Sequence, residues 1–187
     1  TGSIIGLVNA DDAIYSFAIE RVATILSENP IAEFTMFPVD LASRTGNIYG
    51  ISYPLADEVI SLRMWKEMPC CHQGVYVRST TYKKHGLFNE RYPLRADYEL
   101  LLRFLNENVP YVRLEQPVGF FRSGGKSGGM DTWLETRFLL SEFNRPRLQI
   151  EQNFLSSVIK MAAARFLPSN FFKKLKRFNV KSKRRLY

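Results

Sequence analysis

The sequence predicts an α/β fold in which a mixed sheet is flanked by helices and the last third of the chain is helical. Short apolar runs rich in β-branched residues, of which IIGLV at residues 4–8 is the first, are typical of strands. Between them lie segments with apolar residues every three or four positions, the spacing of amphipathic helices. From residue 131 to about residue 167 the pattern is helical, with a break at 144–146.

The expected elements follow one another along the chain. IIGLV is predicted to be a strand covered on both faces, and the next helix is predicted to follow Asp12 and to end at Asn29-Pro30. A second helix is predicted to begin near Asp97, because YELLLRFLNE places its leucines and Phe104 on one side. The remaining strand candidates are EFTMFPVDLA, NIYGISYPLA, GVYVRSTTY and YVRLEQPVGFFR.

Length and composition indicate a globular protein. The chain has 187 residues, of which 45% are hydrophobic, enough to bury a sizeable core. No apolar run approaches the roughly 20 residues that a membrane-spanning helix needs. Cys70 and Cys71 are adjacent, so a disulfide between them is sterically unfavourable and we expect reduced thiols in a cytoplasmic protein. The chain begins at Thr1, and we expect it to be a fragment.

The net charge of +8 is concentrated in the last part of the chain. Residues 1–151 hold 16 Lys and Arg against 18 Asp and Glu, whereas residues 152–187 hold ten basic and no acidic side chains. The segment FFKKLKRF at 171–178 is both basic and amphipathic. It favours either an anionic membrane surface on the inner face of the membrane or a frayed, solvated terminus.

Two adjacent carboxylates, Asp11 and Asp12, follow the first predicted strand. Like charges side by side repel unless a cation, an Arg or water lies between them. Ligands of α/β sheets bind beyond the carboxyl ends of strands, where Mg²⁺ would use such carboxylates together with substrate phosphates. The alternative is that one Asp caps the following helix.

Three further segments carry polar side chains that could take part in chemistry. Asp97, in PLRADYELLLRF, stands where a helix is predicted to begin, and helix capping is the simpler explanation. His72 and Gln73, in CCHQGVYVR, lack the spacing of a zinc site and suit a hydrogen-bonding pocket. In FFRSGGKSGG, glycines and Lys126 could approach a phosphate, but a surface linker fits equally well.

The order and spacing of these segments resemble the later part of a family-two glycosyltransferase with the GT-A fold. The resemblance runs through TGSIIGLVNADDAIY, IYG at 48–50, HQGVYVRSTTYKKHGLFNERYPLRADYELLLRF and FFRSGGKS, and covers about residues 1–130. It implies a partial GT-A domain at residues 1–130. Residues 131–187, predicted from their own pattern to be a helical extension with a basic amphipathic tail, carry no motif that we recognise. It also implies that a nucleotide-binding region preceding the acidic motif is missing, so that the chain alone would have little activity.

The resemblance assigns roles to individual residues. The acidic metal motif falls on residues 9–12, with Asn9 in place of a first Asp, so that Asp11 and Asp12 would contact Mg²⁺ or Mn²⁺ and the sugar diphosphate. Asn9, Asp11 and Lys126 would form the donor side, and Asp97 would be the general base of an inverting transfer. The acceptor, a glycan or a lipid-linked hydroxyl, would lie against four residues: His72, Gln73, Arg95 and Tyr98.

Two other function classes remain as alternatives. A nucleic-acid-binding module would use the basic tail on phosphates, but residues 1–151 are net negative and carry no nucleic-acid motif that we recognise. A phosphohydrolase built on Asp11 and Asp12 would need further His and Asp clusters for a two-metal site. The sequence therefore favours a nucleoside-diphosphate sugar as substrate, with no nucleic acid expected.

Overall fold

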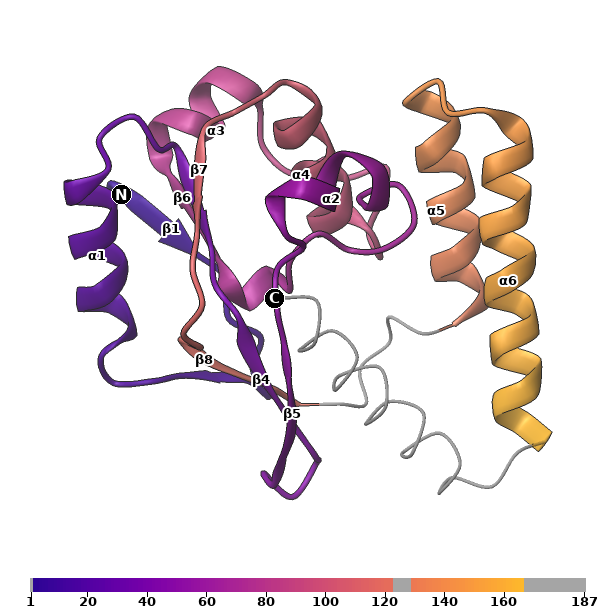
Figure 1. Cartoon of the computed structure of the whole chain (residues 1–187), viewed down its shortest axis with the longest axis horizontal. Coiled ribbons are helices and arrows are strands. Elements are labelled where there is room, and N and C mark those ends of the chain that lie inside the picture. The colour runs from indigo at the N-terminus through magenta and orange to yellow at the C-terminus, as the bar shows by residue number, and fades with distance from the viewer. Residues whose placement is uncertain (1, 123–128, 167–187) are drawn as a thin grey trace. The chain divides into compact units, whose positions relative to one another are not determined.

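A computed structural model describes residues 2–122 and 129–166 of the chain (Figure 1). The chain divides into two compact units, residues 1–125 and 126–187. The strands of the first unit are β1 (Ile4–Gly6), β2 (Ala13–Ile14), β3 (Phe34–Met36), β4 (Val39–Ala42), β5 (Ile48–Ser52), β6 (Val75–Arg78), β7 (Tyr111–Arg113) and β8 (Gly119–Arg122). Its helices are α1 (Ala18–Glu28), α2 (Asp57–Arg63), the 3-10 turn η1 (His72–Gly74), α3 (Ser79–His85) and α4 (Ala96–Asn106).

The strands form two four-stranded sheets. The first has the order β1-β6-β3-β7, in which β6 is antiparallel to both neighbours and β3 and β7 are parallel. The second has the order β2-β8-β4-β5, in which only β4 and β8 are parallel. The α/β class with mixed sheets flanked by helices is therefore as the sequence predicts.

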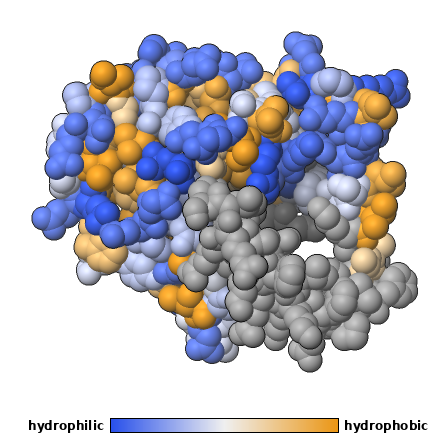
Figure 2. Space-filling view, viewed as in Figure 1, coloured by the Kyte–Doolittle hydropathy of each residue, from blue (hydrophilic) through white to orange (hydrophobic). Residues whose placement is uncertain are grey.

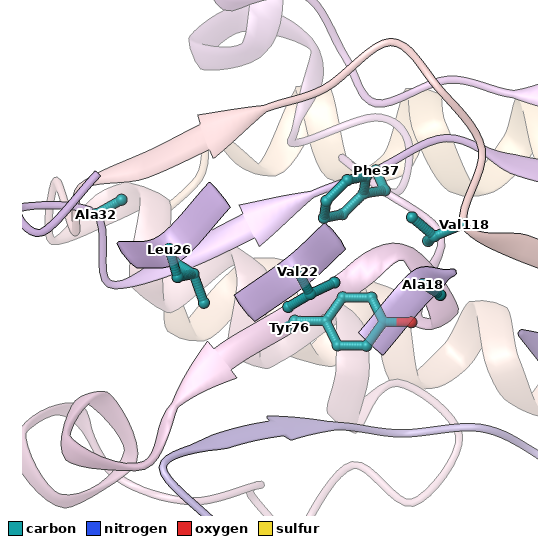
Figure 3. Close-up of a cluster of buried hydrophobic side chains, with 7 residues drawn as sticks. All are labelled: Ala18, Val22, Leu26, Ala32, Phe37, Tyr76 and Val118. Atoms are coloured by element: carbon teal, nitrogen blue, oxygen red, sulfur yellow. The ribbon is translucent and has the colours of Figure 1, made fainter. Parts of the chain in front are cut away.

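Helices cover both faces of the first sheet (Figure 1). On the α1 face, Ala18, Val22 and Leu26 are buried in one cluster with Phe37 and Tyr76 (Figure 3). These helix residues are four positions apart, so a single stripe of α1 meets the sheet.

The opposite face of the first sheet packs against α3 and α4. The Phe34 ring of β3 lies 5.5 Å from the Phe104 ring of α4, and the Tyr82 ring of α3 lies 6.3 Å from Phe104. Because strand side chains alternate between faces, Phe34 reaches α4 while the neighbouring Thr35 points elsewhere, and both are fully buried. The first sheet is thus the middle of three layers. The ends of its strands are not covered by these helices, and polar loops follow them.

Several sequence predictions are corrected by these pairings. The strand at 4–6 is half-buried and lies at the edge of its sheet, so it is not covered on both faces. The first helix begins at Ala18, because Ala13 and Ile14 pair with β8 instead. Neither Asp11 nor Asp12 therefore caps that helix. The predicted strand GVYVRSTTY is a strand only to Arg78 and continues as helix α3.

The second unit is described over two helices, α5 (Met130–Glu142) and α6 (Arg147–Phe166), which contact each other. Residues 143–146 connect them, at the break that the Asn-Arg-Pro sequence predicts. The basic tail at 171–187 lies outside the described residues. Within the described residues, no helix is long and apolar enough to cross a membrane.

Gly74→Ala is expected to destabilise the first unit by roughly 2–4 kcal/mol. Gly74 ends η1, its carbonyl accepts the backbone N–H of Phe37 at 2.8 Å, and a Cβ would overlap the carbonyl oxygen of Phe37. Denaturant titration measures the loss. Gly129→Ala is the matched control, since a Cβ there meets no atom of the described residues within 4 Å, and an equal effect of the two changes would contradict the steric explanation.

Candidate functional site

The first sheet brings two polar segments to one end. Strands β1 and β6 are antiparallel, and Gly6 at the end of β1 pairs with Tyr76 near the start of β6. The segment that leaves β1 therefore lies beside η1, the segment that enters β6. Asp11 and Asp12 belong to the first segment, and His72 and Gln73 belong to the second.

The backbone of residues 9–12 forms a turn in which the Asp12 N–H donates to the Asn9 carbonyl at 3.1 Å. Both carboxylate oxygens of Asp12 accept hydrogen bonds. Oδ1 accepts the backbone N–H of Arg122, at the end of β8, at 2.7 Å, and Oδ2 accepts the side-chain amide of Gln73. Asp12 thus ties together segments separated by 61 and 110 residues in the sequence.

Asp11 is held differently. Its backbone carbonyl accepts the guanidinium Nη1 of Arg122 at 2.8 Å, while its side chain is exposed. The structure thus places an arginine, one of the groups that could offset the paired aspartates, at the backbone of this turn. Arg122 also lies 5.2 Å from the Phe120 ring, which restricts its guanidinium to this side of β8.

A neighbouring thiol fixes the orientation of the Gln73 amide. Burial raises the pKa of Cys71 to about 12, and the negative charges of Asp97 and Asp12 add to the rise, so the side chain stays a thiol. The thiol therefore donates to Gln73 Oε1, with Sγ 2.7 Å from that oxygen. This leaves the Gln73 NH₂ group facing Asp12. Cys71 and the buried Cys70 are both free, as the sequence predicts.

Asp97 is the second residue of α4, and the cap position before the helix is Arg95. Its Oδ1 accepts the backbone N–H of Tyr98 at 2.7 Å, and its Oδ2 lies 3.4 Å from His72 Nδ1. The Asp97 side chain is 36% exposed, so one carboxylate oxygen is held by the helix while the other faces His72 and solvent. Asp97 is therefore not the N-cap that the sequence predicts, because the helix begins one residue earlier, but its side chain still accepts a backbone N–H of the first turn.

Asp97 and His72 lie at the rim of a small, mainly apolar pocket. Its other lining residues are Leu7, Val75, Tyr82, Phe88, Leu100 and Leu101. The structure thus brings a carboxylate and an imidazole together beside apolar side chains.

The structure separates the predicted acceptor residues. His72 faces the pocket, and the Arg95 guanidinium lies 5.6 Å from the Tyr98 ring. Gln73 is 2% exposed and contacts Asp12, so it positions that carboxylate. Tyr98 is 3% exposed and donates its hydroxyl to the Met64 carbonyl at 2.6 Å, so it fixes α4 against the end of α2. The acceptor roles of His72 and Arg95 stay predictions, whereas Gln73 and Tyr98 are buried in contacts with other parts of the chain.

The two aspartates differ in how open their carboxylates are to a divalent cation. In the part of the chain that the structure describes, no three His, Cys, Asp or Glu side chains are grouped as metal ligands. Both oxygens of Asp12 already accept hydrogen bonds, whereas the Asp11 carboxylate is open to solvent. Mg²⁺ and Mn²⁺ bind with one or two carboxylates when substrate phosphates complete the shell. Of the two aspartates, Asp11 is the one whose carboxylate is open to such an ion.

Sequence reasoning missed Arg122 and assigned Gln73 a different role. The FFR sequence gives no local signal for Arg122, because its contact with Asp11 depends on the pairing of β2 with β8. Lys126 lies outside the described residues, and Asn9 is exposed beside Asp12. Their donor-side roles stay predictions.

The fold is similar to that of a solved glycosyltransferase structure. A crystal structure of residues 1–349 of TarS from S. aureus, a glycosyltransferase, matches 88% of this chain with a TM-score of 0.52 and 15% sequence identity. This chain has a glycosyltransferase-like fold. It spans 49% of the TarS chain to which it is similar. No protein-family model and no curated protein sequence matches it.

Proposed function

We propose that this protein is an inverting glycosyltransferase that moves a sugar from a nucleoside-diphosphate donor to a hydroxyl of a glycan or lipid-linked acceptor. The observation that carries the proposal is the grouping of Asp11, Asp12, His72 and Asp97 at one end of a sheet in a glycosyltransferase-like fold. The family-two resemblance of residues 1–130 supports the same class.

Asp97 is the proposed general base. Its Oδ2 is the carboxylate oxygen that is not hydrogen-bonded to the start of α4, and it faces the pocket beside His72. The acceptor O–H gives its proton to this oxygen while the acceptor oxygen bonds to the anomeric carbon. The bond between that carbon and the diphosphate breaks, and its electron pair leaves with the nucleoside diphosphate.

Asp11 and Arg122 are proposed to face the diphosphate. Asp11 would hold Mg²⁺ or Mn²⁺, which when bound supplies positive charge near the departing diphosphate. The Arg122 guanidinium adds a fixed positive charge at the same turn. Asp12 and Gln73 keep this turn in place, because Asp12 joins it to β8 and to η1.

The proposal is tested with the natural full-length protein and a panel of nucleoside-diphosphate sugars. We expect a donor of this class to raise the melting temperature in the presence of Mn²⁺, and to release nucleoside diphosphate when an acceptor is added. A protein that no such donor stabilises, with or without Mn²⁺, would contradict the proposed reaction class.

We further propose that the basic segment 171–187 holds the protein at an anionic membrane surface, where a lipid-linked acceptor would be found. Anionic vesicles are expected to co-sediment with the chain at low salt and to release it at high salt, because surface attraction is screened over about 10 Å at 0.1 M salt. Deletion of 171–187 should abolish this binding. Stronger binding to duplex DNA than to vesicles would favour a nucleic-acid partner instead.

A further inference from the structure

Helix α6 carries an exposed stripe with the spacing of a coiled coil. The stripe residues are separated alternately by four and three positions and are all exposed: Leu148, Gln152, Leu155, Ile159 and Ala162. The large apolar members, Leu148, Leu155 and Ile159, are 71%, 59% and 58% exposed. Steps of four and three average 3.5 residues, the repeat that keeps one seam against a partner helix over several turns.

The stripe lies away from the side of α6 that α5 covers. Ile150 and Ser157 are each 5% exposed, and the Arg137 side chain of α5 pairs with Glu151 at 2.5 Å. The same guanidinium lies 5.5 Å from the Phe154 ring. By helical geometry, Ile150 and Ser157 are on the opposite side of α6 from Leu155. Figure 2 shows hydrophobic surface along the outer side of α6.

The residue types of the stripe indicate both the partner and its orientation. A step of four followed by a step of three places Leu148, Leu155 and Ala162 at d positions and Gln152 and Ile159 at a positions. A β-branched residue at a with Leu at d favours two parallel strands, and one polar a residue fixes the register. We propose that α6 pairs with α6 of a second copy of this chain in a parallel, two-stranded coiled coil.

The positions that flank the seam are compatible with pairing of identical helices. In a parallel pair, residues before each a position face residues after each d position of the other copy. The flanking residues are Glu151, Val158, Gln149, Ser156 and Ala163. Only Glu151 is charged, and it already pairs with Arg137 in its own unit. No like-charge repulsion therefore opposes the dimer, and the two Gln152 amides can hydrogen-bond across the seam.

The proposal predicts a reversible dimer of the full chain. Sedimentation equilibrium over about a hundredfold range of protein concentration should fit a monomer–dimer equilibrium. The double change Leu155→Glu with Ile159→Glu should make the chain monomeric throughout, because it places four carboxylates in the seam of a dimer. Leu134→Glu is the matched control: Leu134 is a 46% exposed leucine of α5, outside the seam, and the dimer should persist.

Gln152→Ile gives a second test of the dimer. It predicts tighter association, a result that a misfolded variant could not imitate. An apolar a position should tighten the dimer at least about tenfold, because the polar residue is present at a cost in stability. A full chain that stays monomeric, a trimer or larger assembly, or equal loss of the dimer in Leu134→Glu would each overturn the proposal. Vesicle binding by a monomeric chain that is lost in the seam variant would show that the stripe faces a membrane instead.

Discussion

Asp97→Asn is expected to slow sugar transfer at least about a hundredfold while the protein remains folded. An amide has no lone pair basic enough to take the acceptor proton, whereas the Asn oxygen can still accept the backbone N–H of Tyr98 that Asp97 Oδ1 accepts at 2.7 Å. The free energy of unfolding should therefore change by less than about 1 kcal/mol. Turnover at saturating donor and a thermal melt of the same preparation separate the two effects.

Asp131→Asn is the matched control for Asp97→Asn. Asp131 is likewise the second residue of a helix, α5, and it is exposed. Its replacement should leave turnover unchanged and alter stability by a similarly small amount. If Asp97→Asn lowers the melting temperature but turns over normally when folded, Asp97 only stabilises α4, and the described lining residues of the pocket would offer His72 and Tyr82 but no second carboxylate.

Asp11→Asn and Asp12→Asn are expected to impair transfer for different reasons. Asp11 is exposed, so Asp11→Asn should cost less than about 0.5 kcal/mol of stability but weaken Mn²⁺ and donor binding and slow transfer about a hundredfold or more. Asp12 accepts hydrogen bonds from both Arg122 and Gln73. An amide at this position would place its NH₂ group, which can only donate, opposite one of these two donors. Asp12→Asn should therefore destabilise the protein by about 1–3 kcal/mol.

Thermal melts and Mn²⁺ binding by electron paramagnetic resonance, measured with donor present, distinguish the two variants without an activity assay. Undiminished Mn²⁺ binding in Asp11→Asn would remove Asp11 as the proposed ligand. Full activity in excess chelator would contradict a role for any divalent ion, and would leave Arg122 as the positive charge at this turn.

The local pattern of the sequence was sufficient to predict helix α4 and the position of Asp97 in its first turn. The signals for both lie within a dozen residues: leucines at helical spacing and an acidic residue where the helix begins. The same kind of signal predicts the end of α1 at Asn29 and the break between α5 and α6. The α/β class follows from such segments, because each must bury its apolar side against another element.

The arrangement of the candidate site was decided by pairings that local patterns do not contain. The pairing of Ala13 with Phe120 in β8 moves the start of α1 to Ala18, so the aspartate pair is not a helix cap. Hydrogen bonds across 61 and 110 residues then join Asp12 to Gln73 and Arg122. The periodicity of a helix and its end positions can be predicted from neighbouring residues, because they depend on contacts within a few helical turns. Which strand lies at a sheet edge, and which arginine meets which aspartate, depends on the free energy of packing the whole unit, and only the tertiary structure decides it.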